Sequence, residues 1–334
     1  MAKQTRTVPV SVSGLTWRPL TERDAGPLYD LLRQLDDAER ASYRTSRDEV
    51  DSMLARKGGW EAIGGYSADA PTEMLAFGYV GVAGIGSREV RCEGGVHPSL
   101  RGKGVGRSLL RWQTKNGTRL LREAFPGQSG FIVHSVSEGH RKLREGLKAM
   151  GYKWSKSYSE LRLRIEDIPP KSGLPSSVKI VPWTVDLDNL ARRAYNRATA
   201  EIGAETFMNS GEWEQLLAQA RRGWSFLAVE QSGDRPEVVG LIAVGAYEQD
   251  WEFLGWSEGV VELIAVVHSE LRDEIVLALV RSSMKALKKS GMDKVVVSLD
   301  PVEDESMLNF YTSLGFDAGS WYYTYQYEVP APRR

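Results

Sequence analysis

Residues 96–110 decide the fold of this chain, and they read VHPSLRGKGVGRSLL. The apolar, β-prone residues 90–96 lead into a turn marked by Pro98, and beyond the turn apolar residues recur at helical spacing. Three glycines stand between strand and helix at alternate positions: Gly102, Gly104 and Gly106. Their amides lie at a helix N-terminus with no side chain in front of them, where a diphosphate can bind. The basic neighbours Arg101 and Lys103 favour the same anion, so the segment predicts a phosphate-binding loop.

Two other kinds of glycine loop do not fit this segment. A P-loop needs Lys followed by Ser or Thr after its last glycine, and a dinucleotide-binding loop has another glycine spacing and a place at the first strand-to-helix turn. The segment instead resembles the acetyl-CoA loop of the GNAT N-acetyltransferases, Arg/Gln-x-x-Gly-x-Gly/Ala, which Arg101, Gly104 and Gly106 fill. Val96 and Pro98 supply the family's Val-x-Pro lead-in. An ordinary glycine-rich turn is the alternative.

The second half of the chain repeats this arrangement. Residues 267–277, VHSELRDEIVL, lie over residues 96–106 without a gap, and Val, His, Leu, Arg and Val recur at matched places. Two further pairs of segments agree: 18–21 with 181–184, and 147–152 with 311–316. The last segment resembles the Tyr-x-x-x-Gly-Phe that closes GNAT domains. The resemblance covers nearly the whole chain and is to the tandem, two-domain type of GNAT protein, of which mycothiol synthase is a member.

This repeat predicts two domains joined by a linker. Residues 1–166 form the N-terminal domain, the Pro- and Ser-rich residues 167–177 the linker, and residues 178–334 the C-terminal domain. A chain of 334 residues can give each domain its own core. The resemblance implies an α/β class with a mixed sheet, in which each domain has a mostly antiparallel, twisted sheet flanked by helices.

The local patterns give the expected elements. Strands are expected at 15–19, 59–65, 74–82, 89–96, 130–136, 152–156, 158–165, 178–182, 225–230, 238–247, 259–267 and 294–299, with terminal strands after residue 314. Helices are expected at 24–36, 47–56, 105–123, 139–150, 187–200, 212–221, 270–289 and 305–314.

The two copies of the loop have diverged in a physically informative way. In the second copy the three glycines are replaced by bulky or acidic residues: Asp273, Ile275 and Leu277. Side chains there block close approach of a diphosphate, and Asp273 with Glu274 would repel it. We therefore expect CoA to bind the N-terminal domain. In mycothiol synthase the second domain is the catalytic one, which argues against this chain being that enzyme.

Composition excludes several classes of function. With 43 basic and 44 acidic residues the net charge is −1, so neither a nucleic acid nor a membrane partner is expected. The single cysteine, Cys92, excludes an internal disulfide and reads as a small buried hydrophobe. The four histidines show no metal-ligand spacing, so no metal is expected. No long apolar segment occurs, which favours a cytoplasmic location. Either a monomer or a homodimer is expected.

Acetylation of an amine by a thioester requires a neutral amine, a donor to the carbonyl oxygen and a proton for the thiolate. The resemblance implies a bulge in the strand before the loop and an exposed amide around Val96 and His97 as the oxyanion donor. It also implies that the loop holds the diphosphate, through Arg101, Gly102, Lys103, Gly104, Val105, Gly106 and Arg107.

Three residues are candidates for the base. Glu89 and Glu93 bracket the strand before the loop, and a half-buried carboxylate there could deprotonate an ammonium. The family often carries a Glu early in this strand, which favours Glu89, although strict counting back from Val96 does not reach it. His134 in the next strand is the alternative. Each also has an ordinary reading, as a solvent-facing charge or a hydrogen-bonded core histidine.

The proton donor is a further open point. Tyr311 stands where many family members have a tyrosine that protonates the departing CoA thiolate, and the first copy has Leu147 there. A ring packed on the sheet is the preferred reading of Tyr311.

These patterns together predict an acetyl-CoA-dependent N-acetyltransferase without a metal, which acts on a primary amine of a small molecule or peptide in a ternary complex. The alternatives are catalysis in the C-terminal domain through Tyr311, a non-catalytic acyl-CoA-binding module, and acetylation of a protein lysine.

Overall fold

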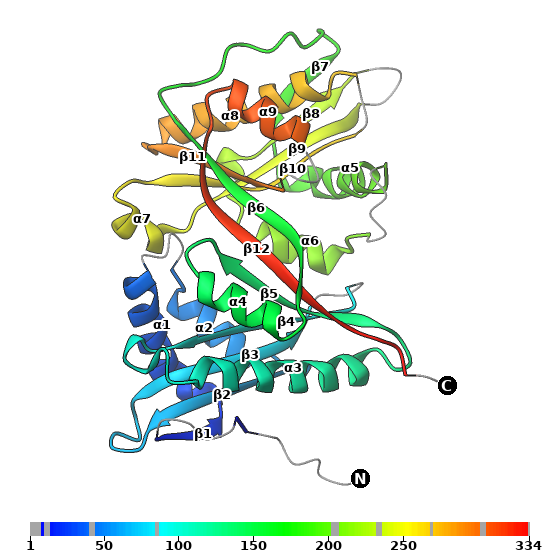
Figure 1. Cartoon of the computed structure of the whole chain (residues 1–334). Helices are drawn as coiled ribbons and strands as arrows, with labels where there is room; N and C mark the ends of the chain where they lie inside the picture. The colour runs from blue at the N-terminus through cyan, green and yellow to red at the C-terminus, as the bar shows by residue number, and fades with distance from the viewer. Residues whose placement is uncertain are drawn as a thin grey trace. The chain divides into compact units, whose positions relative to one another are not determined.

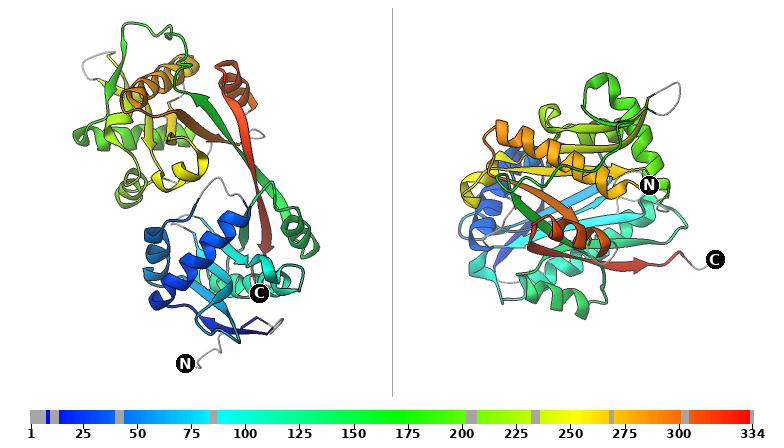
Figure 2. Two further views of the ribbon diagram at one scale, coloured as in Figure 1. Left: turned by 90° about the vertical axis from the view of Figure 1, so that its left-hand side faces the viewer. Right: turned by 90° about the horizontal axis from the view of Figure 1, so that it is seen from above.

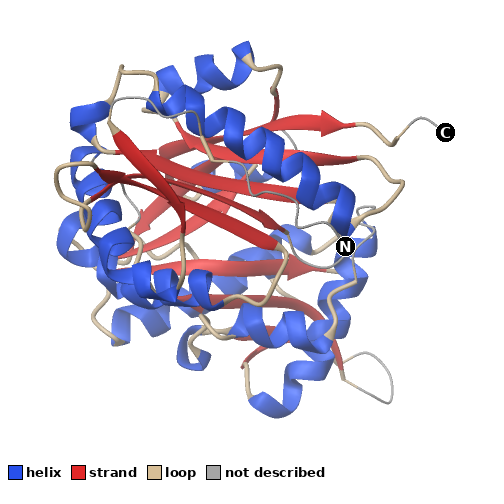
Figure 3. Ribbon diagram, turned by 90° about the horizontal axis from the view of Figure 1, so that it is seen from below, coloured by secondary structure: helices blue, strands red, loops and turns tan. Residues whose placement is uncertain are grey.

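The computed structural model describes residues 8–9, 14–39, 44–83, 87–201, 207–231, 236–267, 270–300 and 305–332. His268, which the repeat aligns with His97, lies outside them. The chain divides into two units, residues 1–157 with 321–334 and residues 158–320 (Figure 1). We call these the first and the second unit. Each consists of a sheet with helices on its faces (Figures 2 and 3).

The first unit holds the elements of the N-terminal half. They are β1 (Leu15–Pro19), α1 (Ala25–Glu39), α2 (Arg47–Ala55), β2 (Trp60–Ser67), β3 (Met74–Val82), β4 (Glu89–Val96), α3 (Val105–Ala124), β5 (Gly130–Ser137), α4 (Arg141–Ala149) and the start of β6 (Lys153–Arg164). Its strands are ordered β1-β2-β3-β4-β5-β12. Neighbours are antiparallel except β4 and β5, which are parallel.

The second unit repeats this plan. It holds β7 (Val178–Pro182), α5 (Asp188–Glu201), α6 (Ser210–Leu217), β8 (Phe226–Glu230), β9 (Glu237–Gly245), α7 (Glu248–Leu254), β10 (Glu258–Val266), α8 (Arg272–Lys289), β11 (Lys294–Leu299), α9 (Glu305–Ser313) and the start of β12 (Asp317–Val329). Its strand order is β6-β11-β10-β9-β8-β7, with β10 and β11 as the parallel pair. The predicted fold class, a mostly antiparallel mixed sheet in each of two repeats, is confirmed.

The two halves exchange their last strands. Residues 159–164 of β6 pair with β11 in the second unit, whereas residues 322–329 of β12 pair with β5 in the first. Three buried side chains of the N-terminal half belong to the core of the second unit: Leu161, Leu163 and Ile165. In return, Tyr325 and Val329 lie in the core of the first unit. The predicted domains, residues 1–166 and 178–334, are each one continuous segment, so the prediction does not foresee this exchange of strands.

Most predicted elements match the structure, and the differences are local. Residues 152–156 and 158–165, expected as two strands, form the single strand β6, because the chain runs on from one unit into the other. Helix α7, which the sequence did not predict, is short and ends at Gly255 in the left-handed region, with φ of +76°. Helix α2 begins where Ser46 and Glu49 form a capping box.

Two buried clusters lie on opposite faces of the first unit's sheet. One joins the sheet to α3 and α4 and includes Val90, Leu109 and Leu147. The other joins it to α1 and α2 and includes Leu28 and Phe77. Helix α3 lies close on β3 and β4, because Gly78 and Gly94 have no side chains where it crosses them. None of the described helices is long and apolar enough to cross a lipid bilayer.

Candidate active site

The glycine-rich loop of the first unit takes the form that the sequence predicts. After β4 the residues Pro98–Leu100 make one turn of 3₁₀ helix, and α3 begins at Val105. Gly102 and Gly104 have φ of +78° and +86°, a region that L side chains rarely adopt, so the backbone itself requires glycine at both places. Gly106 lies inside the helix, and a Cβ there would meet nothing closer than Val96 Cγ2 at 4.0 Å. Glycine at this third place leaves the helix terminus open.

The N-terminus of α3 suits an anion. The first N–H groups of any helix lack carbonyl partners within it and carry the positive end of its dipole. No acidic residue stands in the first turn of α3. The exposed side chains of Arg101, Lys103 and Arg107 lie in or beside this turn.

The matching terminus of α8 is closed by the chain itself. Asp273 and Glu274 stand in its first turn, and Glu274 Oε2 accepts a hydrogen bond of 2.6 Å from the amide of Gly173 in the linker. Ile275 is buried in the core over Gly240, where a Cβ would come within 2.7 Å of it. The second unit thus has carboxylates and a bulky side chain where the first unit has amides without side chains in front of them.

Strands β4 and β5 separate next to the loop. Their parallel pairing runs from Glu89–Phe131 to Cys92–His134 and stops there, although β4 continues to Val96 and β5 to Ser137. In the second unit the pairing of β10 with β11 likewise stops at Val261–Val297. We call the gap beyond Cys92 and His134 the β4–β5 opening.

The bulge expected in β4 is absent, and this prediction was wrong. The register of β3 with β4 is unbroken from Ala76–Val96 to Val82–Val90. Close packing of α3 holds β4 in register, since the buried Gln113 side chain donates a 2.6 Å hydrogen bond to the carbonyl of Glu93. The register shift lies instead in the second unit, in β10 between Val261 and Leu263.

Only one of the two amides expected to act as oxyanion donor faces the opening. The amide of His97 donates to the carbonyl of Leu75 at 2.8 Å and is therefore occupied. Successive residues of an antiparallel strand bond to opposite sides, so the amide of Val96 is directed toward the β4–β5 opening. The carbonyl of Val96 accepts from Arg101 Nε at 3.2 Å, which ties the loop to the end of the strand.

Glu93 is the carboxylate next to the opening. It lies one residue beyond the last β4–β5 pair and opposite Tyr79 of β3, whose hydroxyl accepts from Arg56 Nη1 at 3.0 Å. Its side chain is reached by solvent, yet protein surrounds it closely enough that desolvation raises its pKa, with Arg91 opposing the shift and Glu49 adding to it. Glu89 lies at the other end of β4, in the first pair with β5.

His134 is a core residue of the first unit. It is 5% exposed, its ring meets Tyr152 edge-on, and desolvation lowers its pKa to about 4. Among the described residues, no hydrogen-bond partner reaches Nε2. The neighbouring Cys92 is buried as well, and burial raises the pKa of its thiol.

The surroundings of His134 predict a pH-dependent stability. The unfolded chain protonates His134 near its ordinary pKa of about 6.5, whereas the folded chain resists protonation down to about 4, so stability is lost as the pH falls between these values. In urea unfolding, the wild type should lose roughly 3 kcal/mol more than His134→Phe over that range. His97→Gln, at a half-buried position, serves as control and should keep the wild-type slope.

Tyr311 and Leu147 occupy matching positions in separate units. Tyr311 belongs to the second unit, is 1% exposed, and packs edge-on against Phe310 and Phe316. Leu147 is fully buried in the first unit. Glu93 and Val96 thus lie on the stretch of β4 between its last pair with β5 and the loop. Glu89 lies at the start of β4, His134 is buried in the core at the last β4–β5 pair, and Tyr311 belongs to the other unit.

Three further residues lie near the loop and were not predicted as site residues: Glu39, Ser137 and His140. Glu39, the last residue of α1, is paired with Arg101 and accepts from His140 Nε2 at 2.7 Å. His140 Nδ1 lies 2.5 Å from Ser137 Oγ at the end of β5. These residues are distant in sequence and form no motif, so only the tertiary structure reveals the cluster.

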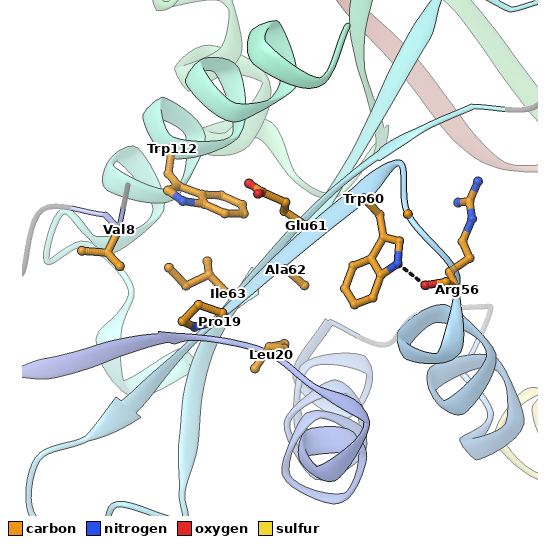
Figure 4. A pocket seen from close by; sticks show the side chains of 10 residues that line it. Val8, Pro19, Leu20, Arg56, Trp60, Glu61, Ala62, Ile63 and Trp112 are labelled. Atoms are coloured by element: carbon orange, nitrogen blue, oxygen red, sulfur yellow. Dashed lines mark hydrogen bonds between the residues drawn. The ribbon is translucent and has the colours of Figure 1, made fainter. Parts of the chain in front are cut away.

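A separate cavity of about 260 Å³ lies beside β1 and β2 (Figure 4). Trp60, Glu61 and Trp112 contribute to its walls, and Glu61 is held by an ion pair of 2.8 Å with Arg119 of α3. It holds none of the predicted site residues. Within the described ranges, no group of three or more His, Cys, Asp and Glu side chains is placed to hold a metal ion.

Comparison with known proteins identifies the fold. A GCN5-related N-acetyltransferase from Sphaerobacter thermophilus superposes with a TM-score of 0.73 at 17% identity, covering 96% of this chain and 98% of that one. The chain has the tandem GNAT fold. The tandem GNAT protein from the clavulanic acid biosynthesis pathway gives a TM-score of 0.68 at 15% identity, over 96% and 99% of the two chains.

A third solved protein also superposes over nearly the whole chain. Saccharomyces cerevisiae N-myristoyltransferase with bound myristoyl-CoA gives a TM-score of 0.58 at 12% identity, over 97% of this chain and 86% of that one. The sequence itself matches no model of a known family and no curated protein. The predicted membership of the tandem GNAT type thus holds at the level of the fold.

Proposed function

We propose that the protein is an N-acyltransferase that moves an acetyl group from acetyl-CoA to a primary amine of a small molecule or peptide. The observation that carries this proposal is the bare, positively charged N-terminus of α3, which lies at the end of β4 where β4 and β5 separate. The chain shares its fold with solved acyltransferases.

The loop of the first unit is the proposed donor site. The amides from Gly102 to Arg107 bind the diphosphate of CoA, and the side chains of Arg101, Lys103 and Arg107 balance its charge. The pantetheine arm then enters the β4–β5 opening. There the amide of Val96 donates to the thioester oxygen as negative charge develops on it.

Glu93 is the proposed base. It lies beside the opening, and its raised pKa brings a carboxylate closer to the range in which it can accept a proton from an ammonium near neutral pH. The neutral amine then attacks the thioester carbon. No metal, nucleic acid or membrane takes part in this proposal, and a cytoplasmic monomer or homodimer is sufficient for it.

Replacing Glu93 tests the base. Glu93→Gln should lower kcat about 100-fold or more without preventing acetyl-CoA binding. In the wild type, kcat/KM for the amine should rise with pH through the raised pKa of Glu93, because only the carboxylate accepts a proton, and Glu93→Gln should lose this rise. Glu89→Gln, at the far end of the same strand, should behave as the wild type. A defect confined to Glu89→Gln would contradict the assignment.

Release of CoA thiol from acetyl-CoA over a panel of primary amines tests the reaction itself. Turnover that depends on one amine would support the proposal. Leu147, an aliphatic residue at the tyrosine position, favours a second candidate, a non-catalytic acyl-CoA-binding module. That module would bind acetyl-CoA tightly and release no thiol with any amine.

A further inference from the structure

Ser137, His140 and Glu39 form a continuous hydrogen-bonded chain in the first unit. Ser137 Oγ lies 2.5 Å from His140 Nδ1, and His140 Nε2 lies 2.7 Å from Glu39 Oε2. Both ring nitrogens are therefore engaged, one by a hydroxyl and one by a carboxylate. We call these residues the Ser137 chain.

The position of the Ser137 chain follows from the strand register. The last β4–β5 pair is Cys92–His134, so continuing three residues along both strands sets Ser137 across the opening from Gly95. Gly95 adjoins Val96, whose amide is directed into the same opening. Helix α1 passes over this place, since a Cβ on Gly95 would come within 2.2 Å of Leu35, and Glu39 lies one helical turn further along.

Negative charge faces His140 from α1. Desolvation would raise the pKa of Glu39, but its hydrogen bond with His140 and the charges of His140 and Arg101 outweigh this and lower it. A carboxylate thus faces the imidazole from α1, and the loop residue Arg101 faces that carboxylate. On α4, which follows His140, Arg144 lies over the ring of Tyr323, 4.8 Å from its centre, and Arg141 pairs with Glu145.

The proposed reaction leaves a thiolate that needs a proton. Leu147 cannot provide one, and Tyr311 is buried in the second unit. The Ser137 chain has a hydroxyl, a titratable ring and an anchoring carboxylate at the mouth of the opening.

We infer that Ser137 delivers the proton to the departing sulfur and that His140, held by Glu39, replaces it. This inference rests on the proposed function. The neutral amine attacks, the C–N bond forms, the C–S bond breaks, and its electron pair goes to sulfur. The nitrogen carries a positive charge after the attack and loses its surplus proton to solvent, which leaves the amide. Sulfur takes the hydroxyl proton of Ser137, and Ser137 takes the Nδ1 proton of the imidazolium. His140 regains a proton from solvent, and Glu93 returns to solvent the proton that it took from the amine.

Steady-state kinetics with acetyl-CoA and the best acceptor of the amine panel test the role of the Ser137 chain. Ser137→Ala should lower kcat roughly 100-fold and leave KM for acetyl-CoA nearly unchanged, because the hydroxyl acts after binding. Ser298→Ala serves as control, since Ser298 is an exposed serine on β11, the matching strand of the second unit, and this variant should retain wild-type kcat.

A pH profile separates proton delivery from a structural role. The wild-type kcat should fall at high pH, where the Ser137 chain can no longer regain its proton from solvent, and Ser137→Ala should lack this fall. Glu39→Gln should shift the fall, because it removes the carboxylate that pairs with His140 Nε2.

Three results would overturn the inference. Unchanged kcat in Ser137→Ala would reject it alone and leave the proposed function standing. Acetylated Ser137, detected by mass spectrometry after incubation with acetyl-CoA, would make the hydroxyl a nucleophile instead of a proton donor. Absence of wild-type turnover with every amine would reject the proposed function and this inference with it.

Discussion

Gly106→Glu is expected to abolish acetyl-CoA binding while the chain stays folded. Gly106 has an ordinary helical backbone and open space around its Cα, so a side chain fits there without strain. The new carboxylate would stand in the first turn of α3, where it occupies the helix terminus and repels a diphosphate. The substitution copies what Asp273 and Glu274 do in the second unit.

The expected effect is a rise in Kd for acetyl-CoA of at least about 100-fold, or about 2.7 kcal/mol, measured by calorimetric titration. Gly106→Ala should bind nearly as the wild type, because it adds bulk without charge. Gly223→Glu, at an open position in the second unit, brings the same charge elsewhere and should change nothing. Unchanged affinity in Gly106→Glu, with the thermal unfolding temperature retained, would place the CoA site outside this loop.

A fragment of residues 1–166 is expected not to fold alone. It lacks the β12 residues that pair with β5, including Tyr325 and Val329 of the core. It also exposes three side chains that the second unit normally covers: Leu161, Leu163 and Ile165. Each such side chain is worth roughly 1.5–3 kcal/mol when buried, so the loss is comparable with the whole stability of a domain, about 5–15 kcal/mol.

Circular dichroism and acetyl-CoA titration would measure this effect, and the expected result is an aggregating fragment without binding. The matched control is the full chain cut at a protease site inserted between Lys171 and Ser172. Its two pieces should remain associated through β6 and β12, and should bind acetyl-CoA as the intact chain does. A soluble 1–166 fragment that binds acetyl-CoA would show that the exchanged strand is dispensable.

Sequence reasoning succeeded where the signal is local. The glycine turn at Gly102 and Gly104, the start of α3 at Val105 and the carboxylates in the first turn of α8 all follow from residues a few positions apart. The prediction of a bulge was wrong because it was taken from the family resemblance, and nothing in residues 89–96 specifies a bulge. Close contact of α3 with Gly94 and Gln113 keeps β4 in register instead.

The residues of the candidate site could be identified only from the fold, because they depend on contacts between distant segments. Glu89 and Glu93 are equivalent as residue types on one strand, and only the end of the β4–β5 pairing after Cys92 shows which of them adjoins the opening. His134 has an ordinary intrinsic pKa in the sequence, and burial in the folded core removes it from the range of a neutral-pH base. Glu39, Ser137 and His140 meet because the last residue of α1 pairs with His140, which follows β5 and bonds back to Ser137.

The sequence by itself determined the repeated plan, the glycine-rich loop before α3 and the half of the chain that keeps its glycines, because turn conformations and local charge depend on neighbouring residues. The tertiary structure alone decided which carboxylate lies beside the opening, which side chains form the Ser137 chain, and that each half completes its sheet with a strand of the other. These outcomes depend on pairing and burial between distant segments, which no local pattern encodes.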